Sequence, residues 1–210
     1  AVLCPDKLRT AEWFEVMEAA HSVGLHSTAT IMFGHIERYE HWARHFLRVL
    51  ELQQRTGGFT EFVPLPFVAE EAPLYLKGRA RKGPTFREAV LMHAVARLVL
   101  SPAIRNIQAS WVKLGNEGVK ACLGAGVNDL GGTLMNESIT RAAGATHGQE
   151  NAPENLDAII HSANRIPRHR STLYGNVDAA QVARSYNAAG LAPLVNDITA
   201  RNPRDNSQLI

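Results

Sequence analysis

Cysteine is scarce in this sequence of 210 residues, which contains only Cys4 and Cys122. Two thiols are too few for a disulfide framework or for a metal site held by four thiolates. The sequence also lacks an apolar run long enough to cross a bilayer, and its start has no signal-peptide pattern. Together these absences predict a cytoplasmic protein that has no membrane partner.

A large excess of charge of either sign is also missing, because the formal net charge is only +2. Five basic residues do lie close together, namely Lys77, Arg79, Arg81, Lys82 and Arg87. Such a local group is more typical of a solvated loop than of a binding patch. The sequence therefore predicts no nucleic-acid partner, while its 45% of hydrophobic residues is enough for one sizeable core.

Short apolar runs alternate with helical patterns along most of the chain. The run 27–33 is β-branched or apolar, ends at Gly34, and predicts a strand buried on both faces. Further strands are expected at 59–64, 106–111 and 126–130, and helices at 6–23, 37–55, 85–100 and 116–123. Four strand–helix units in succession indicate parallel pairing with right-handed crossovers. The predicted fold class is therefore α/β, as the C-terminal half of an eight-unit (β/α) barrel.

The pattern changes after about residue 150. We expect residues 1–150 to form the half-barrel, and residues 151–210 to form an extension of short helices, a basic extended segment and a polar tail. Half a barrel leaves strand edges open, which natural proteins avoid. We therefore expect the chain to be a fragment whose partner is the N-terminal half of its own barrel.

Several polar residues fall where strands end, and in a parallel barrel these ends form the working face. His35 and Glu37 follow the first strand, and Asn128 with Asp129 ends the fourth. Gln108 and Ser110 alternate on one face of the third strand, so that they would point into the barrel and need polar partners.

Each of these residues also has an ordinary structural interpretation. Gly34 could be a simple turn glycine and Met32 a residue that fills a gap in the core. Glu37 could be a first-turn carboxylate that the helix dipole favours. Asn128 and Asp129 could form an Asx turn.

The stretch Thr30-x-Met32-x-Gly34-x-x-Glu37 resembles the G-x-I-x-G-x-x-E strand of radical S-adenosylmethionine enzymes, with threonine in place of the first glycine. In that superfamily this strand packs against the adenine of S-adenosylmethionine. The resemblance therefore implies that these four residues bind the cofactor.

Three longer runs, at 57–67, 106–113 and 128–137, resemble the C-terminal half of the deazaflavin synthases, called FbiC in actinobacteria and CofH in archaea. The likeness extends over about residues 1–195. We expect the polar residues at the strand exits and on the inner face of the third strand to bind substrate, namely His35, Gln108, Ser110, Asn128 and Asp129.

The resemblance also implies a reaction in the biosynthesis of coenzyme F-420. A [4Fe-4S] cluster would reduce S-adenosylmethionine to a 5′-deoxyadenosyl radical, which takes a hydrogen atom from L-tyrosine. The Cα–Cβ bond of tyrosine would then break, and its 4-hydroxybenzyl group would join 5-amino-6-(D-ribitylamino)uracil. The Cys-x3-Cys-x2-Cys motif that holds such a cluster is absent. We therefore expect the cluster ligands in the N-terminal half, and neither a catalytic residue nor a metal ligand in this chain.

Other functions remain open at this point. Two radical enzymes of menaquinone biosynthesis, aminofutalosine synthase and dehypoxanthine futalosine cyclase, resemble the sequence less closely. A metal-dependent barrel hydrolase could use His35 together with His41 and His45, which have metal-ligand spacing on one helical face. A half-barrel without catalytic activity could also serve as a scaffold.

Overall fold

The computed structural model describes residues 6–134, 137–148 and 150–187. Its elements, in chain order, are α1 (Thr10–Ser22), β1 (Ser27–Phe33), α2 (Tyr39–Thr56), β2 (Phe59–Pro66), α3 (Pro73–Leu76), α4 (Phe86–Leu100), β3 (Asn106–Ile107), α5 (Trp111–Gly124), α6 (Ile139–Ala142), α7 (Pro153–Ser162) and α8 (Ala179–Asn187). None of the helices in the described ranges is long and apolar enough to cross a membrane.

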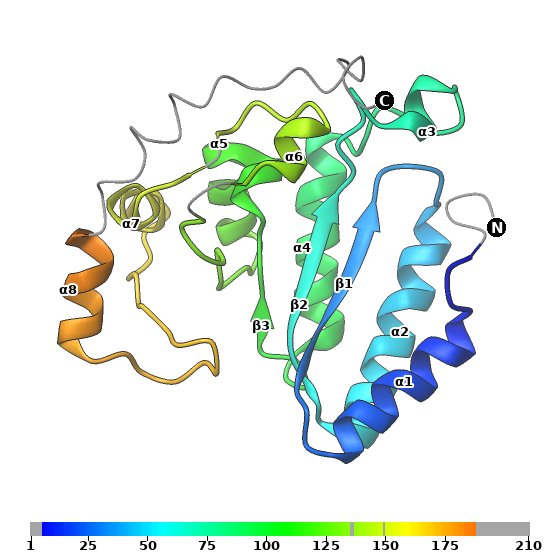
Figure 1. The fold of residues 1–210 in the computed structure, drawn as a ribbon, viewed down its shortest axis with the longest axis horizontal. Coiled ribbons are helices and arrows are strands. Elements are labelled where there is room, and N and C mark those ends of the chain that lie inside the picture. The colour runs from blue at the N-terminus through cyan, green and yellow to red at the C-terminus, as the bar shows by residue number, and fades with distance from the viewer. Residues whose placement is uncertain (1–5, 135–136, 149, 188–210) are drawn as a thin grey trace, which may run out of the picture.

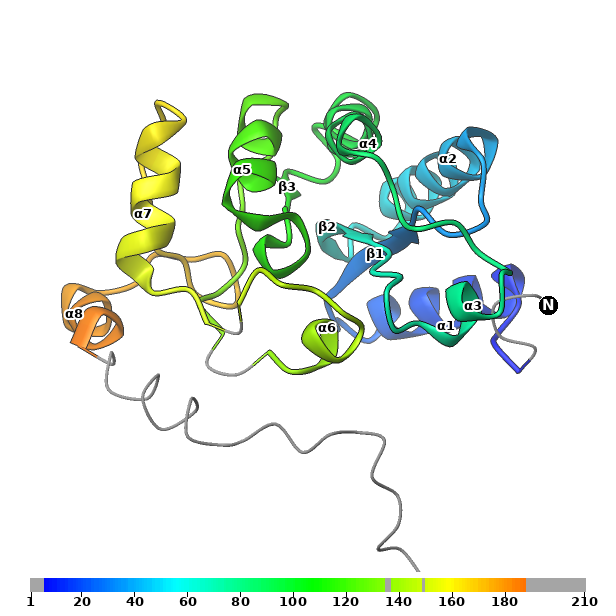
Figure 2. The same ribbon diagram turned by 90° about the horizontal axis from the view of Figure 1, so that it is seen from above.

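The strands form one parallel sheet in the order β1-β2-β3, and Glu61 of β2 pairs with Thr28 on one side and with Asn106 on the other. Helices α2, α4 and α5 lie along one face of this sheet (Figure 1). Seen from above, helices α7, α5, α4 and α2 form an outer arc and the strands lie inside it (Figure 2). The prediction of an α/β fold with a parallel sheet is confirmed, and the arrangement is consistent with part of a TIM-type domain. Closure into an eight-unit barrel stays a prediction.

Local signals in the sequence set the ends of the two longest helices. Thr85 and Glu88 form a capping box at the start of α4, where the Thr85 hydroxyl accepts from the Glu88 backbone N–H at 3.2 Å. Gly57 ends α2 in the left-handed conformation, with φ of 64°. Both boundaries agree with the sequence-based expectation.

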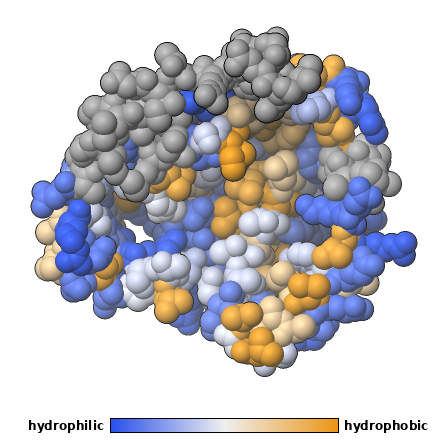
Figure 3. Space-filling model, in the orientation of Figure 1, coloured by the Kyte–Doolittle hydropathy of each residue, from blue (hydrophilic) through white to orange (hydrophobic). Residues whose placement is uncertain are grey.

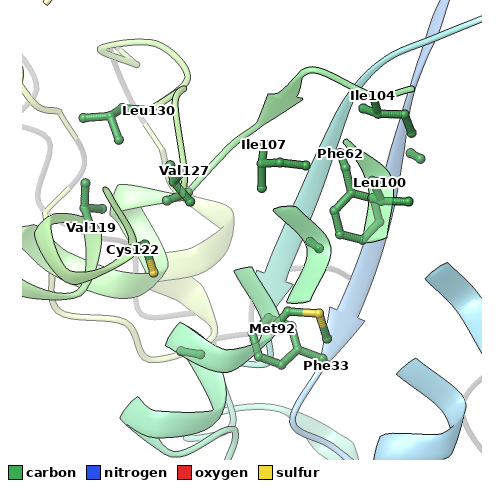
Figure 4. Packing of buried hydrophobic residues seen from close by; sticks show 14 of the residues in the cluster. Phe33, Phe62, Met92, Leu100, Ile104, Ile107, Val119, Cys122, Val127 and Leu130 are labelled. Atoms are coloured by element: carbon green, nitrogen blue, oxygen red, sulfur yellow. The ribbon is translucent and has the colours of Figure 1, made fainter. Parts of the chain in front are cut away.

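The hydrophobic core fills the space between the sheet and the helices behind it. Phe33 and Phe62 from the strands and Met92 and Leu100 from α4 are fully buried there (Figure 4). Burial of a large apolar side chain contributes about 1.5–3 kcal/mol to folding, so this layer is the main source of stability. It holds the strands in place, and with them the residues at their ends.

The prediction that β1 is buried on both faces is wrong. Ala29 and Phe33 point into the core, whereas Thr28, Thr30 and Met32 are exposed. Alternation of this kind arises because successive side chains of a strand point to opposite faces, and the described part of the chain covers only one face of β1. Figure 3 shows the other face, where hydrophobic and weakly polar residues occupy the centre and hydrophilic residues surround them.

The expected strand at 106–111 is wrong beyond its first residues. β3 contains only Asn106 and Ile107, and helix α5 already begins at Trp111 rather than at 116. An early start of the helix buries Trp111, whose indole N–H donates to the Gly132 carbonyl at 2.9 Å. Gly115 then interrupts the helix with a φ of 64°, and the regular helix expected from 116 follows this interruption.

The expected fourth strand at 126–130 is reduced to one bridge, between Gln108 and Asp129. The pairing with β3 is irregular. The Asn128 Oδ1, rather than a backbone carbonyl, accepts from the Ile107 backbone N–H at 2.9 Å, while the Ile107 carbonyl accepts from the backbone N–H groups of both Asn128 and Asp129. The segment follows β3 in parallel without forming a regular strand.

The C-terminal region contains short helices, as expected, namely α7 and α8. Between them, the segment expected to be extended forms a single antiparallel bridge between Arg170 and Asn176. The polar tail after Asn202 and Cys4 lie outside the described residues. The proposed division at residue 150 stays a prediction.

Candidate functional site

The turn that follows β1 is closely packed against the segment before α4. Gly34 has a φ of +93°, and a Cβ atom on it would lie 2.2 Å from Pro84 Cδ. Both facts require glycine here, because L-residues rarely adopt this φ and the space is already filled. Gly34 therefore has a structural reason to be glycine that is independent of any ligand.

Glu37 holds this turn together through both of its carboxylate oxygens. Oε1 accepts from the Gly34 backbone N–H at 2.5 Å and from the Trp42 indole at 3.0 Å. Oε2 accepts from the His35 backbone N–H at 2.9 Å and lies 2.9 Å from His35 Nδ1. The predicted site residues Gly34, His35 and Glu37 are thus brought together.

These contacts determine the charge state of Glu37. Burial by itself would raise its pKa, but the hydrogen bonds from His35, Gly34 and Trp42 outweigh burial and lower the pKa well below its usual range. The carboxylate is therefore ionised at neutral pH, and it accepts its hydrogen bonds from groups of the turn and from the Trp42 indole.

Two apolar side chains beside this turn remain open to a ligand. Met32 is 50% exposed and Ile36 is 39% exposed, whereas His35 between them is buried. Thr30 lies on the same exposed side of β1 as Met32. A flat, weakly polar ligand could therefore contact this face through van der Waals interactions.

A second cluster lies nearer the start of β2. Glu61 Oε2 accepts from the Gln108 amide at 3.1 Å, and Arg170 forms an ion pair with Asp129. Arg170 Nη2 also lies 3.7 Å from Glu61 Oε1. The guanidinium carbon of Arg170 lies over the Tyr174 ring, 4.3 Å from its centre. The C-terminal segment thus supplies the cation for two carboxylates of the sheet.

Glu61 is only 2% exposed, and its Oε1 has no hydrogen-bond partner among the described residues. Burial and the nearby Asp129 carboxylate raise the pKa of Glu61 to about 7, against the opposing effect of Arg170 and of hydrogen bonds. Glu61 can therefore gain or lose a proton near neutral pH.

Beside this cluster is a cleft of about 1300 Å³. Its walls come from three parts of the chain, represented by Asp129 and Gly131, by Leu156 and Ile160 of α7, and by Arg170. Asp129 faces this cleft, and its Oδ1 accepts from the Gly131 backbone N–H at 2.7 Å. This is the Asx-type contact that the sequence left open as an alternative.

Two predicted substrate-binding residues, Asn128 and Ser110, are not brought into the cluster around Glu61. Asn128 Oδ1 accepts from Arg97 Nη2 at 2.6 Å as well as from Ile107, so its amide oxygen is fully used. Ser110 precedes α5 as its N-cap residue and makes no side-chain capping bond. A substrate-binding role for these two residues stays a prediction.

The C-terminal part of the chain matches a known family. Residues 56–183 match the model described as the CofH/MqnC C-terminal region. The chain belongs to this family. Its resemblance to the C-terminal half of the deazaflavin synthases is thereby confirmed.

Similar proteins carry two kinds of name. The 5-amino-6-(D-ribitylamino)uracil--L-tyrosine 4-hydroxyphenyl transferase of Archaeoglobus fulgidus is 51% identical over 178 residues, which are 85% of this chain and 51% of that protein. The transferase of Methanocaldococcus jannaschii is 48% identical over 174 residues, 83% of this chain and 48% of that protein. The FO synthase of Streptomyces avermitilis is 51% identical over 176 residues, 84% of this chain and 20% of that protein. The chain thus spans about half of these transferases and a fifth of this FO synthase.

The described residues of this CofH-type chain do not fit a [4Fe-4S] cluster. Cys122 is fully buried, and burial raises the pKa of its thiol to about 12, whereas cluster ligands are thiolates. No group of three or more potential metal ligands occurs in the described ranges. His41 Nδ1 accepts from the Arg38 backbone N–H at 2.9 Å. The ring centre of His45 lies 5.8 Å from that of Phe62 in the core. These two histidines are therefore engaged in a helix cap and in packing.

The sequence analysis of this family member missed several residues of the two clusters. Arg81 was assigned to a solvated basic loop, and Glu61, Arg170 and Tyr174 were not considered. Arg170 is 41 residues away from its partner Asp129, and no local motif marks the pairing. Glu61 could have been found, because an acidic residue among Phe59, Phe62 and Val63 interrupts an otherwise buried strand.

Proposed function

We propose that this chain is the C-terminal half of a radical S-adenosylmethionine transferase. The reaction would join the 4-hydroxybenzyl group of L-tyrosine to 5-amino-6-(D-ribitylamino)uracil in coenzyme F-420 biosynthesis. One observation carries the proposal, namely about 50% identity over most of the chain to proteins that bear this transferase name. The half-barrel arrangement of three parallel strands and their helices supports it.

The chain's own residues would supply binding and orientation. Bound S-adenosylmethionine, once reduced by a cluster held elsewhere, would supply the radical chemistry. In the proposed site Thr30 and Met32 contact the nucleoside from the exposed face of β1, beside Gly34 and Glu37. His35 would contact tyrosine from the same turn.

The second cluster is proposed to bind the uracil substrate. Gln108 and Asp129 have polar groups at the wall of the cleft, where ribityl hydroxyls and the uracil edge need hydrogen-bonding partners. Asn128 at the cleft wall and Ser110 before α5 are proposed as further members of this group.

The test uses the complete enzyme, defined here as this chain joined to an N-terminal barrel half that carries the cluster. After anaerobic reconstitution, we expect 5′-deoxyadenosine and a tyrosine–uracil adduct of the corresponding mass when both substrates are present. Absence of the adduct with normal 5′-deoxyadenosine formation would contradict the proposed substrates.

A second candidate follows from the family description, which also includes MqnC-type proteins of the menaquinone pathway. The same enzyme would be assayed with dehypoxanthine futalosine. Turnover of that substrate without formation of the tyrosine adduct would favour the menaquinone function.

A further inference from the structure

Arg81 lies in the segment that follows α3, and this segment returns to the exit of β1. The Arg81 backbone N–H donates to the His35 carbonyl at 3.0 Å. Nearby, Pro84 packs against Gly34, and the Phe67 backbone N–H donates to the Phe33 carbonyl at 2.8 Å. The loop after β2 and the turn after β1 are therefore a single packed unit.

The side chain of Arg81 connects two carboxylates from different elements. Its Nη1 donates to Glu88 Oε2 at 2.8 Å, and its Nη2 lies 3.7 Å from Glu37 Oε1. The first distance is a hydrogen bond, whereas the second is an ion pair without a direct hydrogen bond. Glu88 is fixed in turn by the capping box of α4, so Arg81 is held on a rigid support.

Glu37 depends on such a cation because its side chain is only 10% exposed. A carboxylate this far from water is costly unless hydrogen bonds and an opposite charge compensate for its burial. The backbone of Gly34 and His35 and the Trp42 indole supply the hydrogen bonds. Among the described arginines and lysines, only Arg81 forms an ion pair with Glu37.

We infer that Arg81 is a positioning residue for the ligand-contacting turn. It acts through Glu37, which fixes the backbone of Gly34 and His35 and thereby the exposed side chains of Met32 and Ile36. The inference rests on the proposed function, because it treats this turn as the nucleoside-binding surface. Arg81 itself would not touch the ligand.

The experiment compares Arg81→Met, Arg81→Lys and Arg79→Met in the complete enzyme. Arg79 is an exposed arginine of the same loop, and its only described hydrogen bond is from its backbone N–H to the Leu74 carbonyl. The KM for S-adenosylmethionine and kcat per cluster are measured from 5′-deoxyadenosine formation. The indole N–H resonance of Trp42, assigned with a Trp42→Phe variant, reports on the position of Glu37 without any ligand.

We expect Arg81→Met to raise the KM for S-adenosylmethionine by about three- to tenfold and to change kcat little, as loss of one charged contact outside the reacting atoms would. The Trp42 resonance should shift. Arg81→Lys should restore the KM and the Trp42 resonance only part of the way to their wild-type values, because an ammonium can pair with only one of the two carboxylates. Arg79→Met should match the wild-type enzyme.

Three results are distinguishable. An unchanged Trp42 resonance in Arg81→Met overturns the inference, because Glu37 then keeps its position without Arg81. A shifted resonance with an unchanged KM also overturns it, since the turn would not set cofactor affinity. Absence of 5′-deoxyadenosine from the wild-type enzyme with an intact cluster would instead refute the proposed function.

Discussion

Glu37 in the turn after β1 and Glu61 on the neighbouring strand β2 both have side chains that are little exposed, yet their surroundings shift their pKa values in opposite directions. Glu37 has two backbone N–H groups and an indole as donors, and its pKa is lowered. Glu61 receives one described hydrogen bond, from Gln108, and its pKa is raised to about 7. Burial opposes ionisation of both residues. At Glu37 the hydrogen-bond donors outweigh it, whereas at Glu61 the nearby Asp129 carboxylate adds to it.

The two clusters also differ in how they are built. The Glu37 turn is assembled from neighbours in sequence and closed by Arg81. The Glu61 cluster joins β2, the segment after α5 and the C-terminal segment, and leaves one Glu61 carboxylate oxygen without a hydrogen bond from the described residues. A saturated local site suits a fixed surface, whereas an unsaturated one formed by distant segments suits a group that exchanges protons or ligands.

The largest effect is expected at the rigid cluster. Gly34→Val should destabilise the protein by about 3–5 kcal/mol, because the side chain meets Pro84 and the φ of +93° is unfavourable. Gly78→Val is the matched control, since Gly78 also has positive φ but has open space around it. The Gly78→Val variant should lose only about 1–2 kcal/mol of unfolding free energy. Chemical denaturation measures both values, and equal losses would show that contact with Pro84 is unimportant.

The pH dependence of stability should separate the two glutamates. The pKa of Glu61 is raised from 4.5 to about 7, so the folded state binds a proton more tightly than the unfolded state. The contribution of Glu61 to the free energy of unfolding is complete below about pH 4.5. It falls by up to about 3 kcal/mol as the pH rises through 7. The difference between wild type and Glu61→Gln in urea denaturation, measured from pH 4.5 to 8, should show this fall.

Glu37→Gln should give the opposite sign. The lowered pKa of Glu37 means that its contribution is present above about pH 4.5 and is lost as the pH falls below that value. Equal pH profiles for the two variants would show that their environments are not distinct.

A smaller effect is expected when the shared cation of the second cluster is removed. Arg170→Met leaves Glu61 and Asp129 without their counter-charge and should cost about 1–3 kcal/mol, since Arg170 is still 29% exposed. In a Glu61→Gln background the cost should be lower, because only one carboxylate then needs neutralising. A double-mutant cycle measures this coupling, and a coupling energy of zero would separate Arg170 from Glu61.

Local chemistry made part of the fold predictable. Thr85 with Glu88 marked the start of α4, and Gly57 marked the end of α2. Strand β1 was located correctly from its β-branched residues, and the turn at Gly34, His35 and Glu37 was recognised because it uses adjacent residues.

Long-range contacts decided the remainder, and they leave no local pattern. The third strand is shorter than expected because α5 begins at Trp111, and the fourth is irregular because the Asn128 side chain takes one backbone position in its pairing with Ile107. Arg81 and Arg170 resemble solvated cations in sequence, and only the folded chain shows which carboxylates they meet.

Cys122 gives this chain a built-in chemical reporter of core opening. Alkylating reagents attack the thiolate, and with a pKa of about 12 only about one thiol in ten thousand is ionised at pH 8. The side chain is also fully buried in the hydrophobic core. Reaction at Cys122 therefore requires the core around α5 to open, and its rate measures how often this happens.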